Sequence, residues 1–189
     1  MNDWILINQL KEGDQAAFKQ IVDTWQDMVY NTAIGIVQNP EDAEDVTQEV
    51  FVQVFQSIGS FKGDAKLSTW LYRITLSKAL DHERKKKRKK RFAVVRSLFA
   101  GTREEPIEVP DFNHPGVVLD RKEKAAILFR AMKDLPENQR VAFLLNKVEG
   151  LSYQEISEVM ETSVSAVESL LHRAKTNLRK TLKDFYEKQ

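Results

Sequence analysis

Residues 39–51 decide the fold, and they read Asn39-Pro40-Glu41-Asp42-Ala43-Glu44-Asp45-Val46-Thr47-Gln48-Glu49-Val50-Phe51. Asn39 can cap a helix, and Pro40 suits the first helical position, where its missing N–H leaves no bond unmade. Acidic residues follow in the first turn, where the helix dipole favours negative charge. Apolar residues then recur at helical spacing as far as Ile58. The stretch therefore predicts an amphipathic helix with an acidic outer surface.

The segments on both sides of this helix also have helical periodicity. Helices are expected over residues 3–11 and, after a break at Gly13-Asp14, over residues 18–36. Residues 59–66 read as a loop, and Ser68 is expected to cap the helix that follows. That helix runs into eight consecutive cations at residues 84–91, which should fray without a polyanion nearby because like charges repel.

The C-terminal half has a second helical pattern. Residues 92–118 lose the periodicity and hold five Gly or Pro residues, namely Gly101, Pro106, Pro110, Pro115 and Gly116. We therefore expect a flexible linker there. Periodicity returns near Leu119, breaks at Asp134-Leu135-Pro136 and ends at Gly150 before a further pair of helices. The predicted fold is all-α, with two small helical domains over residues 1–91 and 119–189 joined by the linker 92–118.

Composition places the chain among packed proteins of the cytoplasm. It has 189 residues, of which 42% are hydrophobic, and no cysteine, so disulfides and thiolate zinc sites are excluded. The N-terminus has no basic segment followed by an apolar one, so a signal peptide is not expected. No apolar run approaches the length of a membrane span. We therefore expect a cytoplasmic protein.

Charge is divided unevenly along the chain. Residues 1–60 carry two basic and ten acidic side chains, whereas residues 61–91 carry twelve basic and three acidic ones. The net charge of +1 hides this contrast. An acidic block next to a basic block suggests two different partners for one domain.

Residues 152–175 predict a helix-turn-helix. Ser152-Tyr153-Gln154-Glu155 has the form of a capping box, and a second helix is expected after a break at residues 161–163. Its apolar positions Val164, Val167, Leu170 and Leu171 should face inward. The side chains expected to face outward, toward the major groove of duplex DNA, are Glu168, Ser169, His172, Arg173 and Lys175. An ordinary surface helix of mixed charge is the alternative.

Residues 61–74 interleave aromatic and basic side chains. Single-stranded nucleic acid is bound by such mixtures, because planar groups stack on bases while cations follow the phosphates. For Trp70 a place in the core is an equal alternative. The cationic run 84–91 should bind polyanions through counterion release, and an acidic lipid surface is its other possible partner. The carboxylates at 41–45 have no adjacent His, so we expect docking on a basic protein surface and no metal site.

Together these segments resemble the extracytoplasmic-function (ECF) sigma factors of the sigma-70 family. Residues 39–51 look like the family's polymerase-binding helix. Residues 61–85 are similar to its promoter-melting and −10-reading region, and residues 135–175 look like its −35-reading domain. The three occur in the family's order and the resemblance covers nearly the whole chain.

The resemblance implies a role for each group of site residues. Those meeting the clamp helices of core RNA polymerase would be Asp45, Gln48, Glu49 and Gln53. Those capturing or supporting the single-stranded −10 DNA would be Lys62, Asp64, Lys66, Ser68, Trp70, Tyr72, Arg73 and Ser77. The recognition helix would read −35 duplex DNA through the five outward residues named above. The family also implies an anti-sigma factor as a partner.

We therefore predict a sigma factor that directs promoter-specific initiation and has no catalytic activity, cofactor or small-molecule substrate. A stand-alone helix-turn-helix regulator is the first alternative, and it leaves residues 39–74 without a role. An enzyme is disfavoured because His82, His114 and His172 are scattered and no Gly-rich phosphate loop occurs. A membrane-associated polybasic regulator is the remaining alternative.

Overall fold

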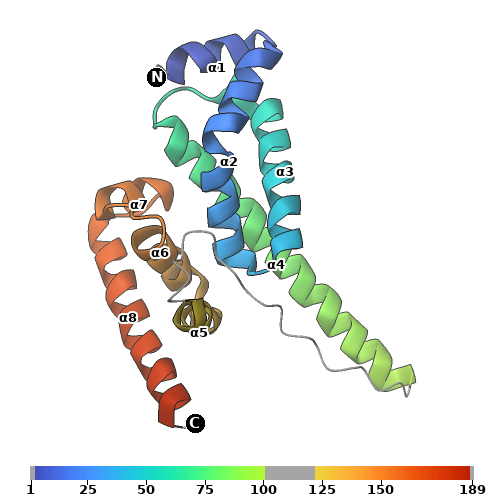
Figure 1. Cartoon of the computed structure of the whole chain (residues 1–189), viewed down its shortest axis with the longest axis vertical. Helices are drawn as coiled ribbons and strands as arrows, with labels where there is room; N and C mark the ends of the chain where they lie inside the picture. The colour runs from blue at the N-terminus through green and yellow to red at the C-terminus, as the bar shows by residue number, and fades with distance from the viewer. Residues whose placement is uncertain (1–2, 101–121, 188–189) are drawn as a thin grey trace.

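The computed structural model describes residues 3–100 and 122–187, and these ranges contain helices and loops but no strand. The N-terminal unit consists of α1 (Asp3–Lys11), α2 (Gln15–Val37), α3 (Pro40–Ser57), the 3-10 turn η1 (Ile58–Ser60) and α4 (Leu67–Ala100). The C-terminal unit consists of α5 (Lys122–Met132), α6 (Glu137–Lys147), α7 (Tyr153–Val159) and α8 (Val164–Glu187). Figure 1 shows both units, and the prediction of an all-α fold is confirmed.

Local sequence signals account for the starts of α2 and α3. The Asp14 carboxylate accepts hydrogen bonds from the backbone N–H groups of Ala16 and Ala17, which caps α2. The Asn39 side chain accepts one from the N–H of Asp42 at 2.9 Å, and Pro40 occupies the first turn of α3. The predicted helix start at residues 39–40 is therefore confirmed. It places the acidic first turn of α3 beside α4.

The predicted cap at Ser68 is wrong. Helix α4 begins one residue earlier, at Leu67, and Ser68 lies within its first turn. The first turn forms around buried apolar residues, because Leu67 is 2% exposed and Leu71 is fully buried. Burial of these leucines, which a capping pattern does not reveal, fixes where the helix starts.

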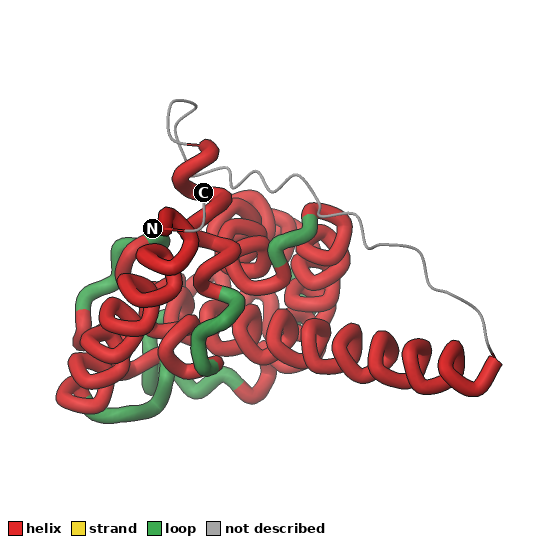
Figure 2. The backbone as a smooth tube through the Cα atoms, turned by 90° about the horizontal axis from the view of Figure 1, so that it is seen from below, coloured by secondary structure: helices red, strands yellow, loops and turns green. Residues whose placement is uncertain are grey.

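The prediction that residues 84–91 fray is also wrong, since α4 continues to Ala100. Carboxylates flank the cationic run and offset its self-repulsion. Lys87 lies 3.5 Å from the Glu83 carboxylate, and Lys86 contacts Asp42 at the start of α3. Figure 2 shows the far end of α4 projecting from the other helices. The expected linker therefore begins in a helix, and its residues 101–118 lie outside the described ranges.

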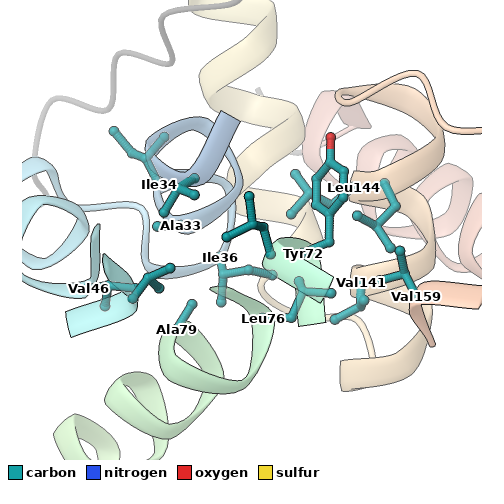
Figure 3. Close-up of a cluster of buried hydrophobic side chains, with 14 of the residues drawn as sticks. Ala33, Ile34, Ile36, Val46, Tyr72, Leu76, Ala79, Val141, Leu144 and Val159 are labelled. Atoms are coloured by element: carbon teal, nitrogen blue, oxygen red, sulfur yellow. The ribbon is translucent and has the colours of Figure 1, made fainter. Parts of the chain in front are cut away.

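The two units pack against each other over α2 and α4. Leu144 of α6 is fully buried against Gly35, where an added Cβ would lie 2.5 Å from Leu144 Cδ1. Figure 3 shows Tyr72 of α4 beside Leu144, with Val141 and Val159 close by. These side chains belong to one continuous apolar cluster. The two predicted domains therefore share part of their core, and hydrophobic burial holds them together.

Polar contacts fix the register of this packing. The guanidinium of Arg140, in α6, donates two hydrogen bonds to the Glu83 carboxylate of α4, at 2.9 and 2.6 Å. Gln38 Nε2, at the end of α2, donates to the carbonyl of Phe129 in α5 at 2.7 Å. Side-chain exposure is 3% for Arg140 and 14% for Glu83, so the pair is largely desolvated. The fork geometry of arginine makes such a contact directional.

Replacement of Arg140 by alanine should destabilise the folded chain. The change leaves the Glu83 carboxylate without its principal partner in a largely desolvated place, so we expect the free energy of unfolding to fall by about 3 kcal/mol. Chemical denaturation followed by circular dichroism measures the loss. Arg130→Ala, at an exposed position of α5, is the control and should change stability by less than about 0.5 kcal/mol. Equal effects of the two changes would contradict a stabilising role for the pair.

Candidate polymerase and nucleic-acid interfaces

The outer face of α3 forms an exposed strip that combines acidic and apolar side chains. Asp45, Gln48 and Glu49 are all exposed and lie one turn apart on this face. Val52 and Phe55 continue the strip and are 55% and 50% exposed. Sequence reasoning missed these two residues, although their spacing after Glu49 could have revealed them. We call these five residues the acidic strip, and its composition suits a protein partner with a basic rim.

Gln53, the fourth predicted polymerase contact, lies elsewhere. It is half-buried and lines a groove of about 530 Å³ between the end of α3 and the N-terminal part of α4, as far as Asp81. We call this groove the α4 groove, and its lining residues are Gln53, Ser57, Ser60, Trp70, Arg73, Ile74, Ser77, Lys78 and Asp81. The groove thus joins one predicted polymerase residue to three predicted −10 residues. Sequence reasoning missed Ser57, Ser60 and Lys78, which reach the groove only through the pairing of α3 with α4.

Trp70 is half-buried, which gives it a place at the edge of the core, while its −10 role stays a prediction. Its ring packs against Phe61, with the ring centroids 5.2 Å apart, and it also lines the α4 groove. In the preceding loop, Lys62, Asp64 and Lys66 are exposed. The Trp70 ring, the polar groups that line the groove and the loop lysines therefore lie together at the N-terminal end of α4.

Tyr72 and Arg73 face the C-terminal unit. Tyr72 is 8% exposed, and its hydroxyl donates to Glu149 Oε2 at 3.2 Å. Arg73 donates to the carbonyl of Glu158 at 2.6 Å and pairs with Glu161 at 2.9 Å. Sequence spacing could not reveal these partners, which lie in α7 and its flanking loops. In this arrangement the C-terminal unit covers part of the predicted −10 surface.

The helix-turn-helix is confirmed, together with its capping box. Ser152 Oγ accepts from the N–H of Glu155, and the Glu155 carboxylate accepts from the N–H of Ser152 at 3.0 Å. These bonds hold the pKa of Glu155 below its ordinary value. Glu161 lies within the turn between α7 and α8 and has φ +52°, in the left-handed region that favours glycine. The turn therefore forms without the glycine that would signal it.

Helix α8 presents most of its predicted residues outward. Val167 and Leu171 are buried, as predicted, and Leu170 is half-buried. Glu168, Ser169, His172 and Arg173 are exposed, and Lys175 is half-exposed. The prediction for Val164 is wrong, because it is 39% exposed. Val164 is the first residue of α8, where the helix has not yet reached the apolar face of α7.

Glu149 is the titratable group of the contact between the units. Burial raises the pKa of its carboxyl to about 7, although hydrogen bonds from Tyr72 and Thr32 oppose the rise. Burial also raises the pKa of the Tyr72 hydroxyl, and the Glu149 charge raises it further. Glu149 therefore exchanges its proton near neutrality only while the units are in contact.

Contact between the two units should strengthen as pH falls. Glu149 has a pKa of about 7 in the contact and an ordinary value of 4.5 outside it, so the packed state binds the additional proton between these values. Its contribution is complete below about pH 4.5 and is lost as pH rises through about 7. Small-angle X-ray scattering from about pH 5.5 to 8 should show a larger radius of gyration at the higher pH.

Glu149→Gln should remove most of this pH dependence. Glu158→Gln is the matched control, because it changes a carboxylate nearby while the Arg73 bond to the Glu158 carbonyl remains possible. A radius of gyration in the unmodified protein that is constant over this range would contradict the assignment.

Two negative findings apply to residues 3–100 and 122–187. No helix there is long and apolar enough to cross a membrane. In the same ranges no three His, Cys, Asp or Glu side chains are grouped so that they could hold a metal ion.

The fold and these surfaces define a helix-turn-helix protein with a second helical unit that carries an acidic and a basic segment. Two family models match the chain: sigma-70 region 2 over residues 21–89 and sigma-70 region 4 over residues 125–178. The RNA polymerase sigma-H factor of Pseudomonas aeruginosa is 32% identical, over 95% of this chain and 93% of that protein. The ECF RNA polymerase sigma-E factor of Escherichia coli is 31% identical, over 93% of this chain and 91% of that protein.

Solved structures have the same fold. CnrH, in complex with the cytosolic domain of CnrY, matches with a TM-score of 0.68 and 24% identity, over 96% of this chain and 97% of that one. The sigma factor RpoE of Bartonella quintana, in complex with the anti-sigma factor NepR, matches with a TM-score of 0.63 and 22% identity, over 88% and 96%. From its region 2 and region 4 matches and its full-length relatives, the chain belongs to the sigma-70 family, as an ECF sigma factor.

Proposed function

We propose that this sigma factor divides three binding tasks among three surfaces: polymerase on the acidic strip, opened DNA at the α4 groove, and duplex DNA on α8. One observation carries the proposal. The groove is built jointly by α3 and α4, and Gln53 lies where it meets the helix that carries the acidic strip. A polymerase held on the strip would therefore place separated promoter strands beside the groove.

The polymerase contact is assigned to Asp45, Gln48 and Glu49, with Gln53 at its edge. Their exposure supports the assignment, because a partner can reach these side chains without moving any other helix. Val52 and Phe55 would add apolar contact at the centre of the interface, and the carboxylates would steer a basic partner toward it.

The −10 contact is assigned to the loop residues Lys62, Asp64 and Lys66 and to the start of α4, with Ser68, Trp70, Tyr72, Arg73 and Ser77. Exposed lysines next to an aromatic groove match the needs of single-stranded DNA. Lys78 also lines the groove and would follow the phosphates. The −35 contact is assigned to Glu168, Ser169, His172, Arg173 and Lys175 on α8.

This division of tasks requires the two units to separate. Tyr72 and Arg73 cannot meet DNA while Glu149, Glu158 and Glu161 hold them. In addition, the −10 and −35 elements lie on different turns of the promoter, so the units must spread to reach both. The arrangement with the units in contact therefore belongs to the protein before it engages a promoter.

Several assignments complete the proposal. The protein has no catalytic activity of its own, because RNA synthesis belongs to the polymerase, and it works in the cytoplasm where that enzyme acts. An anti-sigma factor is a proposed partner, since the solved structures of CnrH and of RpoE from Bartonella quintana each contain a second protein. Such a partner would bind the exposed helices that carry the proposed polymerase and DNA surfaces.

Run-off transcription with purified core polymerase and a library of promoter fragments tests the function. New start sites should appear only when the protein is present. Failure of the protein to bind core polymerase, or to start chains, would overturn the proposal. A stand-alone helix-turn-helix regulator would bind promoter duplex tightly without polymerase and would not be retained by core enzyme in a pull-down.

Charge reversal on the acidic strip should weaken polymerase binding. Glu49→Arg places a cation where a basic partner approaches, so we expect at least about a tenfold loss of affinity, on the scale of like-charge contacts at interfaces. Asp27→Arg, at an exposed position of α2, is the matched control and should retain binding. Fluorescence anisotropy with labelled protein and core enzyme measures both, and equal losses would contradict the assignment.

A reversible cross-link tests the need for separation. The chain has no cysteine, so Gly35→Cys combined with Leu144→Cys introduces a single pair at the contact, where an added Cβ at residue 35 lies 3.3 Å from Leu144 Cγ. The oxidised variant should start few transcripts and regain activity on reduction. Each single variant is a control that should stay active under both conditions. An active oxidised form would show that separation is not required.

A further inference from the structure

Helix α1 lies against the loop of residues 61–66 and holds it at two points. Lys11 Nζ donates a hydrogen bond to the carbonyl of Phe61 at 2.7 Å. Two residues along the loop, Gly63 has φ +83°, and a Cβ added there would lie 2.8 Å from Cζ3 of Trp4. The indole of Trp4 therefore rests on the loop backbone at a position where only glycine leaves room for it.

Trp4 is only partly covered by these contacts. Its exposed fraction is 49%, which leaves a large part of an aromatic ring in solvent beside the loop. The ammonium of Lys11 lies 5.5 Å from the ring centroid, and Lys62 and Lys66 of the loop are exposed. A partly exposed ring with one cation over its face, beside a loop that carries two exposed lysines, has the composition of a stacking surface for unpaired nucleotides.

We propose that Trp4 is a second aromatic surface for the opened promoter strand, on which an unpaired base next to the α4 groove stacks. Lys11 orients the indole and the loop together, and the loop lysines hold the adjacent phosphates. The proposal rests on the proposed function and adds to it a DNA contact from α1, an element outside the loop and α4. Nucleic acid is favoured over a protein partner because the neighbouring charges of the loop and of Lys11 are mainly positive.

Two variants separate stacking from support of the loop. Trp4→Phe keeps an aromatic face, whereas Trp4→Leu keeps apolar contact with Gly63 but removes the ring. Ile5→Ala is the matched control, because Ile5 is the exposed neighbour on α1, at 55%. Each variant is used as the full chain assembled with core polymerase.

Binding is measured on a promoter with an unpaired −10 segment that carries 2-aminopurine at one position at a time. Loss of one base–aromatic stack corresponds to an about 5- to 150-fold weaker complex. We expect Trp4→Leu to weaken binding of this template about tenfold and to lose the fluorescence quenching at one position. Trp4→Phe should retain most of both signals, and all variants should bind core polymerase and a fully paired −35 fragment alike.

Each contrary result has a distinct meaning. Equal binding of the unpaired template by Trp4→Leu and the unmodified protein overturns the stacking role. Loss of core polymerase binding in both Trp4→Leu and Ile5→Ala overturns it in favour of a protein partner on α1. Equal losses in Trp4→Leu and Trp4→Phe with unchanged quenching overturn it in favour of loop support. If the unmodified protein starts no transcripts with core enzyme, the proposed function itself fails.

Discussion

The structure depends on the burial of α4 by helices of both units. Leu71 and Ala79 are fully buried, and Tyr72 and Leu76 nearly so, because α2 and α3 cover one side while α6 and α7 approach another (Figure 3). The side that receives the C-terminal unit also carries Arg73, which we propose to contact −10 DNA. On that proposal, packing of the C-terminal unit and promoter binding compete for the same surface, and the free energy of one limits the occupancy of the other.

The cations near the start of α4 and those farther along it have different acidic partners. Near its start, Lys66 and Arg73 are opposed by carboxylates of the C-terminal unit, with Lys66 3.8 Å from Glu155. Farther along, Lys86 and Lys87 are balanced by Asp42 and Glu83. Glu155 and Glu161 are 44% and 71% exposed, so salt screens their pairs, whereas Asp42 and Glu83 are only 16% and 14% exposed and are screened less. The cationic run of α4 is thus paired with carboxylates that are largely withdrawn from solvent.

Local signals in the sequence predicted the elements well, and long-range packing accounts for what they missed. Asn39-Pro40 and the Ser152–Glu155 box act within one helical turn, so their effect can be read from neighbouring residues. The start of α4 at Leu67, its continuation to Ala100 and the exposure of Val164 depend on which helices pack together. The same holds for the site. An acidic outer surface on α3 followed from periodicity, whereas the exposure of Val52 and Phe55 and the placement of Gln53 in the α4 groove did not.

Gly35 sets the distance between α2 and α6, because the side chain of Leu144 fills the volume that any other residue would occupy. Because glycine has only a hydrogen atom in place of a side chain, Leu144 packs directly against its backbone. No free space remains at the centre of the contact. A single methyl group at this position would act as a wedge between α2 and α6 and would weaken the packing of the two units. The size of one buried residue therefore sets how closely the C-terminal unit can approach α2.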